Sequence, residues 1–258
     1  MRILITNDDG FDAAGIKSLR KIALEMTSED NIFVIAPKVN QSAKSRSVSY
    51  KTAFNIIKRN KNDYSVEGTP TDCIIFALDH FMKNNKPDII LSGINWGYNL
   101  SEDIFYSGTV AAASEGADRG IPSIALSQAY EETNQELNPY LFAESCAPKL
   151  CLSLYENFSV ALENTAWNVN FPANPAVKYP DCIKITQVGK REKSNFGINI
   201  VSKSQNLYTA MIDTISKNRS TTSNDDYVNC LNGYITISPV SMCVQKQKDF
   251  EEFKKVKF

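Results

Sequence analysis

Short apolar runs alternate with segments of helical spacing through the first 130 residues. The run Ile3–Ile5 is typical of a strand buried on both faces, and Ile32–Ala36 is a second run of the same kind. Between them, apolar side chains recur every three or four residues from Ile16 to Met26, as on one face of a helix. Two strands joined by a helix form a parallel βαβ unit with a right-handed crossover.

The same alternation continues to residue 127. Thr69 and Pro70 are typical of a helix N-cap and first helical position, so a helix is predicted from there to about Met82. The other predicted elements are a possible hairpin over 50–57 and 64–66, strands over 87–92 and 121–127, and an alanine-rich helix over 110–118. A long polar loop is predicted over 40–49.

The second half of the chain is less regular. We expect a helix over 138–157 and strands over 167–171, 183–188 and 233–238, the last of them ending before Pro239. The polar stretch 189–226 predicts an extended arm or an exposed hairpin, and 246–258 a charged helix or tail. The fold class is therefore α/β, in one domain of 258 residues: a core over 1–188 and an extension over 189–258.

Composition narrows the choice of function. The chain has 28 Lys and Arg against 29 Asp and Glu, a net charge of −1, which argues against a protein that binds nucleic acid by neutralising phosphates. No apolar stretch is long enough for a membrane helix, so no membrane partner is expected. Six cysteines without a CxxC pair indicate buried thiols in a reducing, cytoplasmic compartment.

Several kinds of catalytic site are excluded. One histidine, His80, cannot supply a two-histidine metal site or a histidine phosphatase, and its mid-helix position favours a structural or surface role. No cysteine has an arginine six residues later, as a cysteine phosphatase requires. The GxGxxG and GxxxxGK[ST] fingerprints are absent. Gly10 stands where the second Asp of a DxD phosphatase motif would be needed.

Polar side chains follow three of the predicted strands where each strand ends. Asp8 and Asp9 follow the first strand, Ser42 lies beyond the second, and Asn95 and Asn99 follow the strand over 87–92. Ligands of an open parallel sheet bind outside the carboxyl ends of its strands. These residues are therefore expected to lie close together.

Two adjacent carboxylates repel each other unless a cation neutralises them. Oxygen ligands from Asp, Ser and Asn suit Mg2+ or Mn2+ better than zinc, so the sequence favours such a metal site. The alternative is that Asp8 merely caps a helix while Asp9 is solvated.

Ser107, Gly108 and Thr109 precede the alanine-rich helix. Free backbone N–H groups at a helix N-terminus, with two hydroxyls beside them, are typical of an anion site, although a plain N-cap has the same pattern. A metal site and an anion site at one edge of the sheet indicate phosphoryl chemistry.

The chain resembles the SurE family of survival proteins, which are metal-dependent 5'/3'-nucleotidases. The matching motifs run in order through nearly the whole sequence. They are Ile3–Gly10, Ala14–Ile16, Asn40–Ser42, Gly68–Cys73, Ser92–Leu100, Tyr106–Ala113, Asn168–Pro172 and Gly233–Ile237. Two positions depart from the pattern: members often have Pro in place of Ala14 and Gly in place of Ala43.

The resemblance implies a Rossmann-like core and a C-terminal part exchanged between the subunits of a dimer or tetramer. It implies one divalent cation per subunit, Mg2+ or Mn2+, held by Asp8, Asp9, Ser42 and Asn95. It also implies a phosphate-binding region, to which we assign Asn99, Ser107, Gly108 and Thr109.

The expected reaction is hydrolysis of a nucleoside 5'- or 3'-monophosphate by water that the metal activates. Asp8 and Asp9 are the predicted catalytic residues, with either able to accept the proton of the water. Direct attack by Asp9, giving an acyl phosphate, is the alternative within catalysis. A non-catalytic nucleotide-binding or sensor protein, and a purely structural assembly protein, are the other two function classes.

Overall fold

The computed structural model describes residues 1–130, 138–157, 164–191, 196–214, 219–220 and 224–241. Nine described strands form one sheet, in the order β3-β4-β2-β1-β5-β6-β7-β13-β8. The strands from β4 to β7 run parallel, whereas β3 and β13 are antiparallel to their neighbours β4 and β7. These nine strands are β1 (Ile3–Thr6), β2 (Ile32–Pro37), β3 (Ile56–Lys58), β4 (Asp63–Val66), β5 (Ile89–Trp96), β6 (Ser123–Gln128), β7 (Thr165–Phe171), β8 (Ile183–Ile185) and β13 (Ile235–Ser241).

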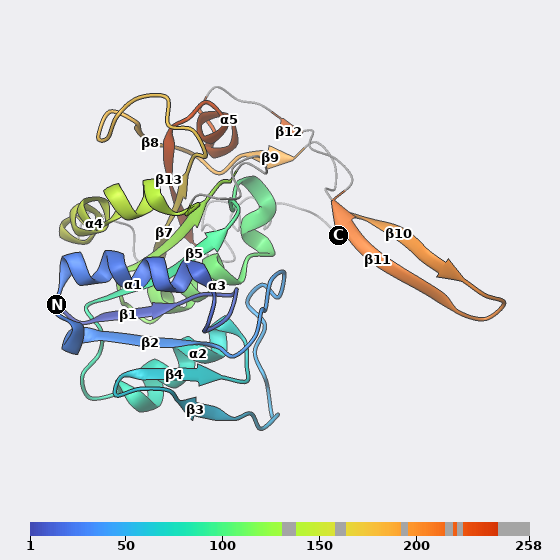
Figure 1. The fold of residues 1–258 in the computed structure, drawn as a ribbon, viewed down its shortest axis with the longest axis horizontal. Helices are drawn as coiled ribbons and strands as arrows, with labels where there is room; N and C mark the ends of the chain where they lie inside the picture. The colour runs from blue at the N-terminus through green and yellow to red at the C-terminus, as the bar shows by residue number, and fades with distance from the viewer. Residues whose placement is uncertain (131–137, 158–163, 192–195, 215–218, 221–223, 242–258) are drawn as a thin grey trace, which may run out of the picture.

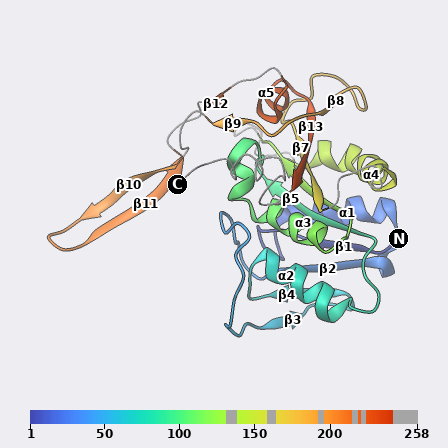
Figure 2. The same cartoon turned by 180° about the vertical axis from the view of Figure 1, so that it is seen from behind.

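Helices cover both faces of the sheet, which confirms the predicted α/β class and its Rossmann-like core (Figures 1 and 2). Helices α1 (Ala14–Met26) and α4 (Leu141–Glu156) pack on one face, in a core that includes Ile3 and Ile5. On the other face lie α2 (Pro70–Phe76), its π-helical continuation η2 (Ala77–Phe81) and α3 (Gly108–Asp118). Leu4 contributes to that second core, because successive residues of a strand point to opposite faces.

The start of α2 follows the sequence prediction closely. The Thr69 side chain accepts a hydrogen bond from the backbone N–H of Asp72, and the Asp72 carboxylate accepts one from the backbone N–H of Thr69. This capping box, with Pro70 at the first helical position, fixes where the helix begins. His80 is exposed and stacks on Phe76, as its predicted surface role requires.

The extension carries a long hairpin that projects from the body of the molecule (Figure 1). It is formed by β10 (Phe196–Lys203) and β11 (Tyr208–Thr214), so the exposed hairpin, one of the two structures predicted within 189–226, is found. The remaining elements are η1 (Glu29–Asn31), η3 (Ser101–Phe105), β9 (Lys190–Arg191), β12 (Arg219–Ser220) and α5 (Asp226–Leu231). In the part of the chain described, no helix is long and apolar enough to span a membrane.

The structure differs from the sequence expectations in several places. The first hairpin is confined to Ile56–Val66, with residues 50–55 irregular. Strand β5 continues to Trp96, so Asn95 lies inside the strand, just after the shift in its pairing with β6. Strand β13 continues past Pro239, and the short helix α5 was not predicted. The predicted helix or tail over 246–258 falls outside the described residues.

Candidate active site

The sheet order places the ends of β1, β2 and β5 side by side. Strand β1 lies between β2 and β5, and all three run parallel, so the segments that follow them leave the same edge of the sheet. The backbone N–H of Gln41, in the loop after β2, donates to the carbonyl oxygen of Asp8 at 2.7 Å. The backbone N–H of Trp96, at the end of β5, donates to the Asp9 carboxylate at 3.3 Å. The predicted convergence of these segments is therefore observed.

The Asp8 carboxylate is buried against the N-terminus of α3. Its Oδ1 accepts a hydrogen bond from the Thr109 hydroxyl at 2.5 Å, and its Oδ2 accepts one from the Gly108 N–H at 3.1 Å. Gly108 allows this approach, because a Cβ there would lie 2.7 Å from the Asp8 Cβ and 2.9 Å from Oδ2. Asp8 is thus bound to the start of a helix, but that helix is α3 and not the helix that follows it in the sequence.

Burial governs the protonation of both carboxyl groups. Desolvation raises the pKa of Asp8, and the hydrogen bonds from Thr109 and Gly108 oppose that rise. Desolvation, together with the negative charge of Asp8, raises the pKa of Asp9 to about 6, opposed by the Trp96 N–H. Two carboxyl groups that are costly to ionise side by side are an arrangement that a bound cation would stabilise.

Asn95 and Ser42 belong to the two segments that contact the carboxylate pair. The Asn95 side-chain N–H₂ donates to the Gly97 carbonyl at 3.0 Å, and its Oδ1 lies 3.4 Å from the Thr109 hydroxyl that also bonds Asp8. Ser42 is exposed, one residue beyond the Gln41 N–H that holds Asp8. All four predicted ligands therefore belong to segments that meet at Asp8, and their role as ligands stays a prediction.

The end of β5 is shaped by Gly93. Its φ is +138°, and a Cβ there would lie 2.3 Å from the Leu126 carbonyl oxygen of β6. The pairing of β5 with β6 shifts register between Ser92 and Asn95, just where Gly93 lies. The irregular backbone after Gly93 carries the Asn95 side chain to the edge of the sheet.

The donor set fits a hard cation on chemical grounds. Neither Asp8 nor Asp9 forms an ion pair with a Lys or Arg among the residues described. The described ranges also contain no cluster of three or more His, Cys, Asp or Glu side chains able to hold a metal ion. A cation at this edge would therefore be held by two carboxylates and by neutral oxygens such as that of Asn95, a set typical of Mg2+ or Mn2+.

The predicted phosphate-binding residues divide into two groups. Ser107 caps α3, its hydroxyl accepting a hydrogen bond from the Val110 N–H at 3.1 Å. Asn99 is buried: its side-chain N–H₂ donates to the Ser127 hydroxyl at 2.8 Å, and its backbone N–H donates to the Asn170 side chain at 2.8 Å. Gly108 and Thr109 bond the Asp8 carboxylate and Ser107 precedes them at the start of α3, whereas Asn99 bonds Ser127 and Asn170. Phosphate binding by these four residues stays a prediction.

Sequence reasoning missed three features around the site. Tyr140, which precedes α4, is buried, and desolvation together with the negative charge of Asp9 raises its pKa. Tyr130, two residues after β6, has its ring 4.7 Å from that of Trp96. Arg46 binds the Glu115 carboxylate of α3 at 2.6 Å. These pairings join residues that are distant in sequence, so no spacing along the chain signals them.

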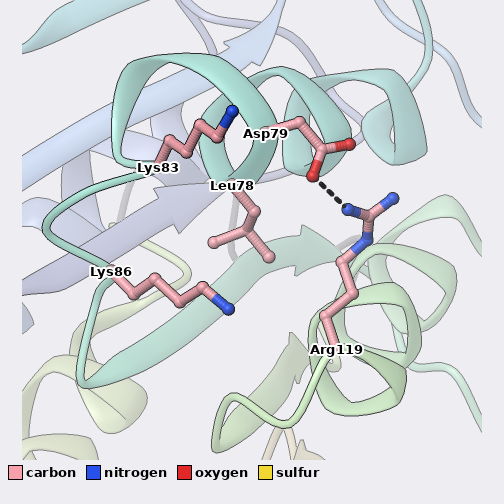
Figure 3. A pocket seen from close by; sticks show the side chains of 5 residues that line it. All are labelled: Leu78, Asp79, Lys83, Lys86 and Arg119. Carbon is pink, nitrogen blue, oxygen red and sulfur yellow. Dashed lines mark hydrogen bonds and ion pairs between the residues drawn. The ribbon is translucent and has the colours of Figure 1, made fainter.

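A hollow of about 450 Å³ lies elsewhere on the molecule (Figure 3). Leu78 forms part of its wall, and Lys83, Lys86 and Arg119 surround it together with Asp79. Lys86 precedes β5 and Arg119 precedes β6, so the hollow is at the amino ends of these parallel strands. It is therefore separate from the carboxyl-end site at Asp8 and Asp9.

Comparison with known proteins decides the family. The model of the family described as Survival protein SurE matches residues 3–195. The chain belongs to the SurE family. The matched range contains Asp8, Asp9, Ser42, Asn95 and Ser107–Thr109.

SurE relatives match most of the chain. A protein named 5'-nucleotidase SurE from Ehrlichia ruminantium (strain Gardel) is 38% identical over 252 residues, covering 93% of each chain. A relative of the same name from Wolbachia pipientis subsp. Culex pipiens is 38% identical over 245 residues, 94% of this chain and 88% of the relative. The crystal structure of the SurE protein from Aquifex aeolicus has a TM-score of 0.76 at 31% identity, with 98% of each chain covered. The SurE fold thus extends over nearly all of this chain.

Proposed function

We propose that this SurE-family chain is a nucleotidase: a metal-dependent phosphomonoesterase that hydrolyses nucleoside monophosphates to nucleoside and phosphate. The observation that carries the proposal is the buried Asp8 carboxylate fixed on the N-terminus of α3, with Asp9 and Asn95 beside it. Relatives that match more than nine-tenths of the chain are named 5'-nucleotidases.

Asp8 and Asp9 have different proposed roles at the edge of the sheet. Both oxygens of Asp8 are engaged by α3, so this carboxylate is a fixed negative charge that would hold a cation in one place. Asp9 is only partly buried and is the carboxylate that a water molecule can reach. We assign to Asp9 the acceptance of the proton from the attacking water, and to Asn95 and Ser42 the remaining protein oxygens around the cation.

A bound Mg2+ or Mn2+ supplies neutralisation of the phosphate charge and activation of water. The start of α3 would orient the substrate through the positive end of its helix dipole, because the Gly108 N–H and the Thr109 hydroxyl are already bonded to Asp8. The Ser107 and Thr109 hydroxyls would border the phosphate. Asp8, Asp9, Asn95 and Ser42 would hold the cation, and a phosphate held beside them at the start of α3 would be oriented for attack by water.

The position of the phosphate on the ribose is the finer part of the proposal. The names of the relatives state 5'-nucleotidase activity, and we extend this to 3'-monophosphates. Comparison of phosphate release from matched 5'- and 3'-monophosphates tests the extension. Release from the 5' isomer alone would remove the 3' activity from the proposal.

A non-catalytic nucleotide sensor on the same fold is the competing function. It would keep the helix N-terminus of α3 but would have no need for two adjacent carboxylates. We expect phosphate release from AMP that depends on added Mg2+ or Mn2+ and stops when EDTA removes the metal. Tight AMP binding with no release at any metal concentration would favour the sensor.

The hairpin of β10 and β11 supports self-association. Ile198 and Ile212 are paired across the hairpin, and their side chains are 64% and 71% exposed. An isolated two-stranded hairpin is at best marginally stable in water, and large exposed apolar surfaces are typical of interaction sites. We propose that the hairpin packs on a second copy of the chain, in a dimer or tetramer in which the extension is exchanged. Residues 1–188 and 189–258 then act as core and assembly arm of one domain.

The five cysteines that the structure describes are free and buried. Unpaired thiols are typical of a reducing compartment, which supports the proposed cytoplasmic location.

A further inference from the structure

An exposed pair of aromatic rings lies directly beside the candidate site. The rings of Trp96 and Tyr130 are 4.7 Å apart with an angle of 38° between their planes, and the two residues are 49% and 43% exposed. Trp96 is the last residue of β5, and Tyr130 follows β6, the neighbouring strand. Adjacent large rings left open to water at the edge of a binding site are typical of a surface that another flat group covers.

The backbone ties this pair to the carboxylates. The Trp96 N–H donates to the Asp9 carboxylate at 3.3 Å, and Trp96 immediately follows Asn95. The Trp96 backbone therefore lies at the Asp9 carboxylate, next to the place proposed for the cation and the phosphate. Among the described residues, Trp96 is the exposed aromatic residue whose backbone donates a hydrogen bond to one of the two carboxylates.

Neighbouring groups fix the orientation of the indole. Tyr140, which is 2% exposed, meets the Trp96 ring edge-on with the centroids 6.0 Å apart. Gly97 has a φ of +97°, and a Cβ there would lie 3.7 Å from the Tyr130 ring. The Trp96 ring is thus supported by buried structure on one side while a large part of it stays open.

Phe105 and Tyr106 are the competing aromatic surface. Both are exposed, but the Tyr106 ring already meets Phe196 of the hairpin edge-on at 4.9 Å. The carbonyl groups of both residues accept hydrogen bonds from Ser45, so this segment packs on the loop after β2. Neither feature links these rings to Asp9.

We propose that Trp96 and Tyr130 form the base-binding subsite of this chain, on which the purine or pyrimidine ring of the substrate stacks while its phosphate lies at Asp8 and Asp9. The inference rests on the proposed nucleotidase function. Every base presents a π-face, so stacking binds bases with little regard to their identity. The subsite therefore favours nucleotides over phosphate esters that lack a base, and it discriminates weakly among the bases.

The test compares AMP with ribose 5-phosphate, which carries the same phosphate and sugar without a base. For each variant the measured quantity is the ratio of kcat/KM for AMP to kcat/KM for ribose 5-phosphate. We expect Trp96→Ala to lower this ratio about tenfold, through a higher KM for AMP, and Trp96→Phe to restore most of it. Phe105→Ala, which removes an aromatic ring that is 56% exposed, is the matched control and should leave the ratio unchanged.

Two results would overturn the subsite. Equal losses with AMP and ribose 5-phosphate in Trp96→Ala would mean that the ring acts only by holding the backbone at Asp9. A drop of the ratio in Phe105→Ala, with none in Trp96→Ala, would place the base on the other aromatic surface.

A binding measurement tests the base-binding subsite independently of the proposed nucleotidase activity. The chain has two tryptophans, so the Trp167→Phe variant reports Trp96 alone by its fluorescence. We expect AMP to quench this emission, with Mg2+ present, and ribose 5-phosphate to leave it unchanged. Quenching without phosphate release would refute the nucleotidase function and keep the subsite. AMP turnover without any change in emission would refute the subsite and keep the nucleotidase.

Discussion

The Asp8 carboxylate owes its position to donors that lie 100 and 101 residues further along the chain. The apolar run before Asn7–Gly10 predicts that Asp8 ends a strand, and the sheet rule predicts which edge it occupies. Its bond to Thr109 depends on how α3 packs, and local pattern carries no such information. Sequence alone therefore predicts that these segments meet at one edge of the sheet, as observed, but not the hydrogen bonds that form between them.

Thr109 is expected to set the affinity of the site for a cation. Replacing Thr109 by Val removes the hydroxyl bonded to Asp8, so the buried carboxylate loses one of its donors. We expect Mn2+ to bind about 10- to 100-fold more weakly, as measured by isothermal titration calorimetry. Thr109→Ser keeps the hydroxyl and is the control. Unchanged Mn2+ affinity in Thr109→Val would show that this bond does not position the ligand.

The buried thiols should react slowly in the native protein. Desolvation raises the pKa of Cys146, Cys151 and Cys230 to about 12, so at pH 8 the thiolate, the reactive form, is a far smaller fraction than for a free cysteine. We expect alkylation by iodoacetamide to be about 100-fold slower or more for these residues than in guanidinium chloride. Peptide mass spectrometry measures each site, and fast labelling of any of the three in the native state would contradict their burial.

At the scale of elements, the sequence pattern predicts the loop after β2 but not the contacts that hold it. Its polar composition predicts a loop, and the structure has no regular element between Pro37 and Ile56. Yet the loop is held in place: Arg46 binds Glu115 and Asp118 of α3, and Ser49 binds Asp72 of α2.

Pro239 lies inside a strand that the sequence predicts to end before it. The strand β13 continues through it because β8 pairs with β13 only as far as Ile237, so the missing N–H leaves no ladder bond unmade on that side.

Arg46 is expected to anchor this loop on α3. The Glu115 carboxylate is mostly buried and is shared by Arg46 and Arg119. Arg46 is the partner of Glu115 that comes from the loop, so Arg46→Met removes this link between the loop and α3. We expect the free energy of unfolding to fall by about 1–3 kcal/mol and Mn2+ to bind more weakly. Arg119→Met is the comparison, since Arg119 lies beside α3 and holds no part of the loop. Denaturant titration and calorimetry measure the two effects. Equal Mn2+ affinity in Arg46→Met and the native protein would contradict the anchoring role.

Ala43 carries strain that glycine would relieve. Its φ is +59°, a region where a Cβ is unfavourable. We expect Ala43→Gly to stabilise the folded state by up to about 1 kcal/mol, offset in part by the greater freedom of glycine in the unfolded chain. A urea titration measures the change. Destabilisation by more than about 0.5 kcal/mol would show that the left-handed conformation is not strained.

At the scale of the whole molecule, the projecting hairpin is the feature that a single subunit does not explain. Its strands pair with each other and its apolar side chains lie open to water. Polar composition over 189–226 predicts an exposed arm, but nothing in the sequence pattern predicts how far it projects.

Charged substitutions on the hairpin should dissociate the assembly. We expect the native chain to elute as a dimer or tetramer and the double variant Ile198→Glu, Ile212→Lys to shift toward a monomer. Opposite charges at directly paired positions preserve the hairpin itself. Size-exclusion chromatography with light scattering measures both masses. A native monomer, or an unchanged mass in the double variant, would contradict the proposed packing.

The most direct test of the whole account is metal-dependent phosphate release from AMP by a pair of matched variants. Asp8→Asn removes the fixed charge at the edge of the sheet, whereas Asp12→Asn makes the same change at an exposed residue that pairs with Arg59. With Mn2+ at saturation and folding verified by circular dichroism, we expect Asp8→Asn to lose at least about 100-fold in kcat/KM, and Asp12→Asn to retain nearly all of it. Full turnover by a folded Asp8→Asn protein would contradict a catalytic site built on this carboxylate.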